Sequence, residues 1–395
     1  MSHPDPSSID DAKARYAAER AKRVRDEGIA QYEGLKEHHL DRDTYADPDF
    51  ERDPITEEVE VVVLGGGYAG MLTGINLMKK GITSFRIIEK AADFGGTWYW
   101  NRYPGIMCDV ESYIYMPLLE DLGYIPEDRY ATGEEILAHL QAIASRYDLE
   151  RDALFHTGVT RAAWDDDVGR WAITTDRGDS FSCRYYVLAV GFPNLLKLPD
   201  SPGIDTFGGR AFHTARWDYD YTGGGPHSPL PKLEGRKVAL IGTGATGVQC
   251  VRPLAEAADR VYVFQRTPSA VGVRGNRPTA PDFADRLEPG WQQDRMDNFE
   301  AIMMGVPVEE DLVDDAWTHH FALASNPPRE PGMSTAEFLR NAEELDFGIM
   351  EEHRERVASL VEDPGTAEAL KPYYRYRCKR PCFHDEFLSS FNLPN

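Results

Sequence analysis

Two glycine-rich segments have the residue types and spacing of a phosphate-binding turn. GGGYAG at residues 65–70 and GTGATG at residues 242–247 both contain the pattern G-x-G-x-x-G. In such a turn the first glycine permits a tight bend, the second lets a pyrophosphate approach the backbone, and the third lets helix and strand pack closely. We therefore predict two dinucleotide-binding sites, the first with contacts from Gly65, Gly67 and Gly70, and the second with contacts from Thr243, Gly244, Ala245, Thr246, Gly247, Val248 and Gln249.

The residues after the next strand distinguish the two sites. Glu89 ends the strand after the first turn, where a carboxylate accepts hydrogen bonds from a ribose. The equivalent place after the second turn holds Arg266 and Thr267, and a guanidinium binds a 2′-phosphate that a carboxylate would repel. We therefore predict FAD at the first site and NADPH at the second. The simpler alternatives are a solvent-facing Glu89 and an Arg266 held in a surface ion pair.

Two dinucleotide sites in one chain imply that a hydride passes from a nicotinamide to a flavin. Several classes of flavoprotein fit that description. A disulfide reductase would need a redox-active cysteine pair near the first site, and Cys108 stands alone there. A flavin enzyme of another class is therefore expected.

The elements expected around each turn are those of a Rossmann unit. Strand, helix and strand are expected at 59–64, 71–80 and 84–89, with Gly81 ending the helix, and again at 237–241, 248–258 and 260–265. The fold class is therefore α/β, with two Rossmann-like domains for FAD and NADP and a helical insertion in the NADP domain. The expected division is an N-terminal helical leader at 1–57 with a surface helix over 10–36, the first part of the FAD-binding domain at 58–200, a linker at 201–235, and the NADP-binding domain at 236–395 with its insertion at about 280–360.

The linker carries the motif that identifies a family. FGGRAFHTARWD at 207–218 resembles the fingerprint F-x-G-x-x-x-H-x-x-x-W-D of type I Baeyer–Villiger monooxygenases at every fixed position. N-hydroxylating and flavin-containing monooxygenases have a similar stretch, usually with another residue in place of Trp217. In the family the histidine serves domain movement, so we do not assign His213 to the chemical step.

The resemblance extends to segments that contact the cofactors. GGTWYWNRYPG at 95–105 looks like the family's flavin-covering loop, and CKRP at 378–381 resembles a Lys-Arg pair that serves NADPH and the flavin. Family members commonly have arginine where Met107 stands, so the substrate pocket is expected to differ from theirs. The contacts that the resemblance implies are Thr97, Trp98, Tyr99, Trp100, Met107, Cys108, Asp109, Tyr115, Val159, Lys379 and Arg380.

The family uses FAD, NADPH and O2 to convert a ketone into an ester or lactone through a peroxide at the flavin C4a, so the resemblance implies that reaction here. A guanidinium suits it because it stays charged and cannot protonate a peroxide. Arg380 is the candidate catalytic residue and Asp109 is expected to orient it, whereas the plain alternative is an ion pair that only bridges domains. The competing functions are N- or S-oxygenation, and a non-catalytic flavin-binding fragment or redox module.

The two ends of the chain add a further expectation each. The chain stops at Asn395, where family chains continue, so the remainder of the FAD domain is expected outside it. The long leader resembles that of members acting on bulky, macrocyclic or polycyclic ketones.

Composition and charge exclude several classes of partner. The net charge of -23 repels polyanions, so neither nucleic acid nor an anionic membrane is expected. Neither a long apolar run nor a signal peptide is recognisable, and five scattered cysteines suit reduced thiols, so a cytoplasmic enzyme is expected. Cys378, Cys382 and His384 fit no common zinc spacing, so no metal is expected. The expected partners are a small ketone and O2, and no pattern indicates an oligomeric state.

Overall fold

The structure is a computed structural model that describes residues 6–34, 43–191 and 196–395. The chain separates into two compact units, each built from several segments. Unit 1 comprises Met1–Gln31, Tyr103–Ala131 and Tyr219–Asn395, and unit 2 comprises Tyr32–Arg102 and Thr132–Asp218. The assignment of linear domains to each cofactor stays a prediction.

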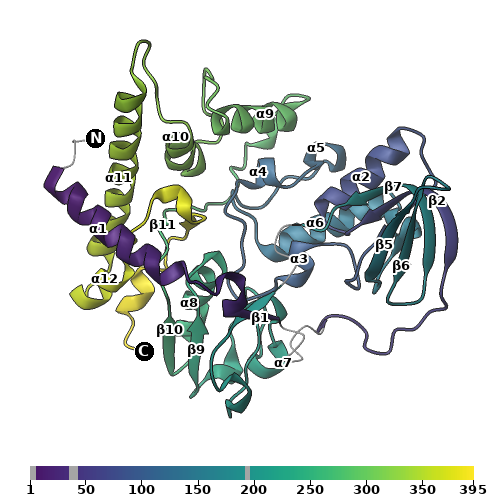
Figure 1. The fold of residues 1–395 in the computed structure, drawn as a ribbon, viewed down its shortest axis with the longest axis horizontal. Coiled ribbons are helices and arrows are strands. Elements are labelled where there is room, and N and C mark those ends of the chain that lie inside the picture. Colours follow the sequence, from purple (N-terminus) through teal and green to yellow (C-terminus); the bar gives the residue numbers. More distant parts are fainter. Residues whose placement is uncertain (1–5, 35–42, 192–195) are drawn as a thin grey trace. The chain divides into compact units, whose positions relative to one another are not determined.

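Unit 2 is built on a six-stranded sheet of order β4-β3-β2-β7-β6-β5 (Figure 1). The first four of these strands are parallel, and β6 and β5 continue the sheet in antiparallel fashion. The central strand β2 carries the run VEVVVL, because a parallel strand covered on both faces needs apolar residues at successive positions. The strands are β2 (Thr56–Leu64), β3 (Phe85–Ile88), β4 (Ala153–Leu154), β5 (Val159–Asp165), β6 (Arg170–Thr175) and β7 (Ser180–Leu188).

The remaining elements of unit 2 are short apart from two helices. The Thr132 hydroxyl accepts a hydrogen bond from the Glu135 backbone N–H at 3.1 Å and thereby caps α6. Gly81 follows α2 with φ +77°, the left-handed conformation that glycine adopts most easily at a helix end. The elements are α2 (Tyr68–Lys79), α3 (Thr97–Trp100), α6 (Gly133–Arg146), η3 (Leu149–Asp152), η4 (Ile204–Thr206), η5 (Thr214–Arg216) and the antiparallel pair β1 (Tyr32–Gly34) and β8 (Lys197–Pro199).

Unit 1 contains two small parallel sheets and most of the helices (Figure 1). One sheet pairs β9 with β10, and the other pairs β11 with β12, whose residues lie far apart in the sequence. The strands are β9 (Lys237–Ile241), β10 (Arg260–Phe264), β11 (Val271–Gly272) and β12 (Cys382–Phe383). The helices are α1 (Pro6–Arg23), α4 (Ser112–Tyr115), α5 (Leu119–Leu122), α7 (Tyr219–Thr222), α8 (Ala245–Ala257), α9 (Trp291–Met303), α10 (Ala322–Ser325), α11 (Thr335–Leu360), α12 (Pro364–Leu370), the π-helix η8 (Trp317–Phe321) and the 3-10 turns η1 (Gly28–Gln31), η6 (Pro231–Leu233), η7 (Ala284–Arg286), η9 (Tyr376–Cys378) and η10 (Ser389–Asn392).

The leader helix is shorter than predicted. The sequence suggested a helix over 10–36, but α1 ends at Arg23, and Gly28 follows with φ +54° at the start of η1. That left-handed conformation breaks the helical path. Within unit 1, α1 packs on α11, where the Tyr16 and Phe347 rings stack with centroids 5.1 Å apart. Residues 1–5 and 35–42 of the predicted leader lie outside the described residues.

The helices after both glycine turns begin earlier than predicted. α2 begins at Tyr68 and α8 at Ala245, so the third glycine of each turn is already helical. A Cβ on Gly70 or Gly247 would lie 1.8 or 2.2 Å from the carbonyl oxygen of the first glycine of its own turn. Only glycine therefore lets these helices start so close to the preceding strand.

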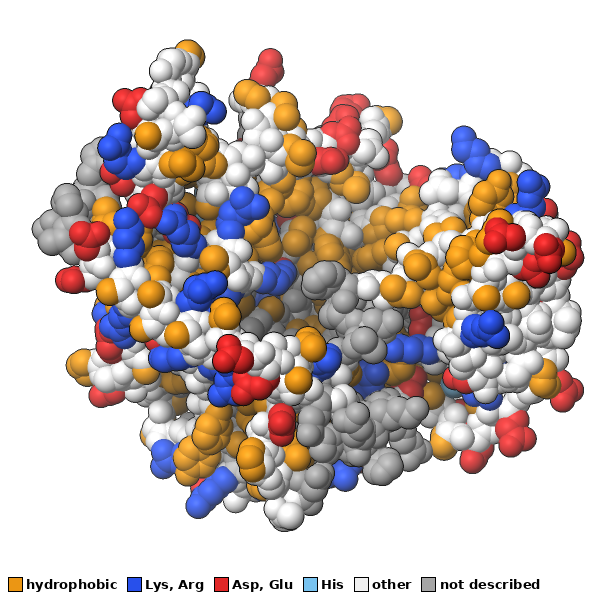
Figure 2. Space-filling view, in the orientation of Figure 1, with side chains coloured by type: hydrophobic (Ala, Val, Ile, Leu, Met, Phe, Trp, Pro, Cys, Tyr) orange, Lys and Arg blue, Asp and Glu red, His pale blue; other side chains and the backbone are white. Residues whose placement is uncertain are grey.

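The surface and the helices add two observations on partners. Figure 2 shows Lys and Arg side chains scattered among Asp and Glu on the face drawn, with no continuous basic patch among the described residues there. No described helix is both long and apolar enough to cross a bilayer.

Candidate active site

The first glycine turn lies at the carboxyl end of β2, in unit 2. Gly65 has φ +114°, and a Cβ there would lie 2.4 Å from the carbonyl oxygen of Ala189. The Glu89 carboxylate is 6% exposed and accepts hydrogen bonds from the backbone N–H groups of Gly66 and Ala91, at 2.6 and 2.8 Å. Glu89 is therefore buried under the turn rather than facing solvent, and its lone pairs still allow bonds to ribose hydroxyls.

The second turn, in unit 1, also has a first glycine with positive φ and is also held by hydrogen bonds with neighbouring residues. Gly242 has φ +103°, and the carbonyl oxygen of Thr243 accepts a 2.6 Å hydrogen bond from the Ser269 hydroxyl. The Thr243 hydroxyl donates to Oε1 of Gln265, which follows β10, at 3.0 Å. The turn is thus fixed to the end of the neighbouring strand.

Both turns leave space where a dinucleotide pyrophosphate would approach. A Cβ on Gly244 would meet no atom within 4 Å, and one on Gly67 would meet only Gly96, at 3.4 Å or more. The second glycine of each turn therefore borders open space, whereas the third glycine lies against the carbonyl oxygen of the first glycine of the same turn. That combination fits a ligand that contacts bare backbone.

Three residues predicted to hold NADPH lie together in unit 1. Arg266 is exposed, and its Nη1 donates a 2.6 Å hydrogen bond to the Gln31 side chain. The Lys379 ammonium donates to the carbonyl oxygens of Thr267 and Pro268, at 3.1 and 2.9 Å. Burial lowers the pKa of Lys379 to about 8. Lys379 thus reaches the strand end that carries Arg266 and Thr267.

Asp109 and Arg380 form a two-pronged ion pair. Nη1 and Nη2 of Arg380 donate to the two carboxylate oxygens of Asp109, each at 2.6 Å. The Asp109 side chain is 8% exposed, whereas the Arg380 side chain is 49% exposed. Burial lowers the pKa of Arg380, but the hydrogen bonds and charge of Asp109 outweigh burial and raise it. The result is a permanently charged guanidinium in a fixed orientation, open to solvent on one side.

Trp317 holds this pair and has no counterpart among the predicted residues. Its indole N–H donates to the Asp109 carbonyl oxygen at 2.6 Å, and the Arg380 guanidinium lies over its ring, 5.3 Å from the centroid. Trp317 begins η8, in the acidic, helical stretch where the sequence offered no recognisable motif. No spacing signal links it to Asp109.

The segment before Asp109 contacts the helix of the second turn. The Met107 backbone N–H donates to the Gln249 side chain at 2.8 Å, and Cys108 N–H donates to the carbonyl oxygen of Ala131 at 2.9 Å. Burial raises the pKa of the Cys108 thiol, which keeps it protonated and unreactive. Met107, Cys108, Asp109 and Tyr115, expected as cofactor contacts, thus belong by their packing to the same unit as the second turn.

The predicted contacts from the flavin-covering loop, together with Val159, lie in unit 2. Trp98 and Tyr99 in α3 are buried, and the Tyr99 hydroxyl donates to Asp43 at 2.9 Å. The Arg216 guanidinium, from the 207–218 fingerprint, lies 3.9 Å from the centroid of the Trp100 ring. Thr97 begins α3, and Val159 begins β5 opposite Thr175. The flavin-covering loop and the fingerprint are therefore in contact.

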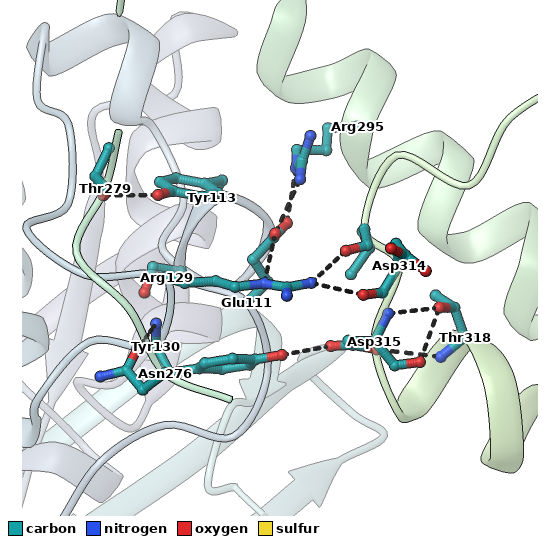
Figure 3. Close-up of polar contacts among 12 residues, drawn as sticks. Glu111, Tyr113, Arg129, Tyr130, Asn276, Thr279, Arg295, Asp314, Asp315 and Thr318 are labelled. Carbon is teal, nitrogen blue, oxygen red and sulfur yellow. Dashed lines mark hydrogen bonds and ion pairs between the residues drawn. The ribbon is translucent and has the colours of Figure 1, made fainter. Parts of the chain in front are cut away.

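A buried charge network, missed by sequence reasoning, supports the segment that carries Asp109 (Figure 3). Arg295 of α9 donates to both carboxylate oxygens of Glu111, at 2.7 and 2.8 Å, and Arg129 contacts the same carboxylate at 3.3 Å. The Tyr130 hydroxyl donates to Asp315 at 3.0 Å. Burial raises the pKa of Glu111, and the guanidinium groups of Arg295 and Arg129 oppose that rise. No motif in the sequence linked these residues to one another.

Comparison with known proteins gives relatives along the whole chain. A family model for an NAD(P)-binding Rossmann-like domain matches residues 63–122. Pentalenolactone D synthase of Streptomyces exfoliatus is 55% identical over 358 residues, which cover 90% of this chain and 61% of the relative. A Baeyer–Villiger monooxygenase of Streptomyces coelicolor is 46% identical, covering 99% of this chain and 65% of the relative. The chain thus spans less than two thirds of the length of these two curated relatives.

Solved structures give the same result. Polycyclic ketone monooxygenase from the thermophilic fungus Thermothelomyces thermophila matches with a TM-score of 0.91 at 40% identity, over 99% of this chain and 67% of that chain. NADP+-bound cyclohexanone monooxygenase from Rhodococcus sp. Phi1 matches with a TM-score of 0.69 at 31% identity, over 87% of this chain and 64% of that chain. Taken with the two glycine turns and the fingerprint, these similarities show that the chain belongs to the Baeyer–Villiger monooxygenase family.

Proposed function

We propose that this protein inserts one oxygen atom from O2 next to a ketone carbonyl, giving an ester or lactone, with FAD and NADPH as its cofactors. The Asp109–Arg380 pair is the observation that carries the proposal. The two glycine turns supply backbone for two dinucleotides, and Glu89 and Arg266 distinguish FAD from NADPH. The free thiols of the described residues support a cytoplasmic enzyme.

FAD, once reduced by NADPH, supplies the electrons that activate O2. Arg380 acts on the charge that develops during oxygen insertion, because its guanidinium stays protonated and cannot neutralise an attacking oxygen anion. Its N–H groups stabilise the carbonyl oxygen of the ketone as that oxygen becomes negative. Asp109 and Trp317 hold the guanidinium in place, so little reorganisation is needed when charge appears.

Bulky ketones are the substrate class we favour. The solved relative with the TM-score of 0.91 is named for polycyclic ketones, and this chain matches it over 99% of its own length. The leader helix α1, which led to the same expectation, is packed on α11 rather than detached from unit 1.

The test separates flavin reduction from oxygenation in the flavin-loaded enzyme. Arg380→Ala should still bind FAD and be bleached by NADPH without oxygen, but ester formation should fall about a hundred- to a thousandfold, as when one preorganised donor is removed. Arg380→Lys should recover little, because an ammonium lacks the two-pronged geometry. The exposed Arg377→Ala, which removes the same charge nearby, is the matched control.

The measured quantities are the anaerobic bleaching rate and the ester formed per NADPH consumed in air. Near-normal ester yield from Arg380→Ala would refute the role of Arg380. Hydroxylamine or sulfoxide products, with no ester from any ketone, would instead identify a heteroatom monooxygenase.

A further inference from the structure

Arg274 is a buried arginine that no part of the proposed chemistry uses. Its residue is 8% exposed, and among the described residues its Nε and Nη1 atoms are buried without a hydrogen-bond partner. An arginine is rarely buried unless its charge is paired, because the desolvated N–H groups lose their bonds to water. The described residues therefore leave these two nitrogen atoms of the guanidinium without the partner that a buried arginine needs.

The fold connects the loop that carries Arg274 to the two segments that carry Asp109 and Arg380. It follows β11, whose partner strand β12 begins two residues after Arg380 in the sequence. Its backbone N–H donates to Asp385 at 3.0 Å, just beyond β12. Farther along the same loop, Asn276 accepts a 2.9 Å hydrogen bond from the Tyr130 backbone. Arg274 is thus connected to both segments that carry the ion pair.

The connection on the Asp109 side runs through the backbone. Ala131, next to Tyr130, accepts a hydrogen bond from the Cys108 N–H at 2.9 Å, and Asp109 follows Cys108. The negative charges that act on the Arg274 guanidinium are, accordingly, those of Asp385 and Asp109. Burial lowers the pKa of Arg274.

Among the described residues, neither carboxylate forms a hydrogen bond or an ion pair with the Arg274 guanidinium. Both oxygens of Asp109 already accept from Arg380, and Asp385 accepts from the backbone N–H groups of Arg274 and Gly275. A second guanidinium, that of Arg356, also has a buried Nε without a partner among the described residues. Three guanidinium groups, those of Arg274, Arg356 and Arg380, thus share the two carboxylates of Asp109 and Asp385, although the chain as a whole carries a net charge of -23.

We propose that Arg274 forms an anion-binding subsite next to the Asp109–Arg380 pair, and that it takes a carboxylate carried by the ketone substrate. This inference rests on the proposed function. The subsite binds the carboxylate through charge-assisted hydrogen bonds from guanidinium N–H groups that have no other partner. It positions the ring of the ketone and leaves the oxygen insertion to Arg380.

The coenzyme phosphates are the other possible source of an anion. The second glycine turn and Arg266 already offer sites for the pyrophosphate and the 2′-phosphate. The Arg274 loop is instead bonded to the segments that carry Asp109 and Arg380, the residues proposed to serve oxygen insertion. The substrate is therefore the ligand that fits this position.

The test uses the flavin-loaded enzyme and ring ketones of one, two and three rings, each as a carboxylic acid and as its methyl ester. Calorimetry gives the Kd of each member of a pair, and steady-state assays give kcat/KM. The wild-type enzyme should prefer the acid on at least one skeleton, and Arg274→Met should lower that acid-to-ester preference roughly ten- to a hundredfold. Arg274→Lys should restore part of it. Arg277→Met, which removes an exposed charge from the same loop, should change the preference by no more than roughly twofold.

Three outcomes would overturn the proposal. These are a wild-type enzyme without preference for any acid, an unchanged preference in Arg274→Met, and a loss of NADPH affinity in Arg274→Met in place of a loss of acid affinity. Failure of the proposed function is a separate result, because the Kd values do not depend on oxygenation. A wild-type enzyme that binds keto acids through Arg274 but makes no ester would refute only the reaction.

Discussion

The two kinds of glycine in the second turn predict opposite effects of the same small substitution. Gly244→Ala should leave stability unchanged, because Gly244 has φ -80° and ψ -173° and its Cβ would meet nothing within 4 Å. Gly247→Ala should destabilise the fold, because its Cβ would lie 2.2 Å from the Gly242 carbonyl oxygen. Relieving that overlap requires a backbone shift, and overpacking of this kind costs about 1–3 kcal/mol.

The effects on NADPH affinity should have the opposite order, with the larger loss in Gly244→Ala. The methyl group of Gly244→Ala occupies the space through which a pyrophosphate reaches the backbone N–H groups. Each charge-assisted hydrogen bond lost costs about 1.5–3 kcal/mol, so the Kd should rise roughly ten- to a hundredfold. In Gly247→Ala, any loss of affinity should follow the loss of stability.

Thermal unfolding and coenzyme titration of the same preparations measure both effects. Gly244→Ala should retain the wild-type Tm and lose NADPH affinity, while Gly247→Ala should lose several degrees of Tm. Equal losses of Tm in the two variants, or full NADPH affinity in Gly244→Ala, would show that the open space beside Gly244 is not the pyrophosphate position.

Further predictions address FAD, coenzyme choice and acid stability. Gly67→Val should purify folded but depleted of FAD, and full flavin absorbance would exclude the first turn as its site. Arg266→Ala should raise KM for NADPH roughly ten- to a hundredfold more than KM for NADH, since only NADPH carries the 2′-phosphate, and equal losses would mean a structural role. Hydrogen bonds from Arg52, each 2.6 Å long, lower the pKa of Asp179 from 3.8 to about 2. Because the folded pKa is the lower one, the stabilisation is present above about pH 4 and is lost as the pH falls towards 2, and it amounts to about 2 kcal/mol. In urea denaturation, Asp179→Asn should remove the fall in the free energy of unfolding between about pH 4 and pH 2. If that fall is the same in the variant as in the wild type, the Arg52–Asp179 pair is not its cause.

The glycine turns and their flanking strands could be predicted from sequence because their conformations are determined locally. A tight bend with positive φ requires glycine at Gly65 and Gly242, and the residue after the next strand lies at a fixed distance from the turn. The helix starts were predicted too late because the closeness of Gly70 and Gly247 to their own turns is a packing property. The end of α1 was also missed, since its charged residues continue beyond Arg23.

The charges around the candidate site depended on the tertiary structure. Asp109 and Arg380 are 271 residues apart. The family resemblance identified both residues, but nothing in their spacing showed that they form a contact. Glu111, Arg129 and Arg274 have nothing in their sequence surroundings that separates them from solvated surface charges. Burial depends on which distant segments pack over a side chain, and only burial turns an ordinary arginine into one that needs an anion.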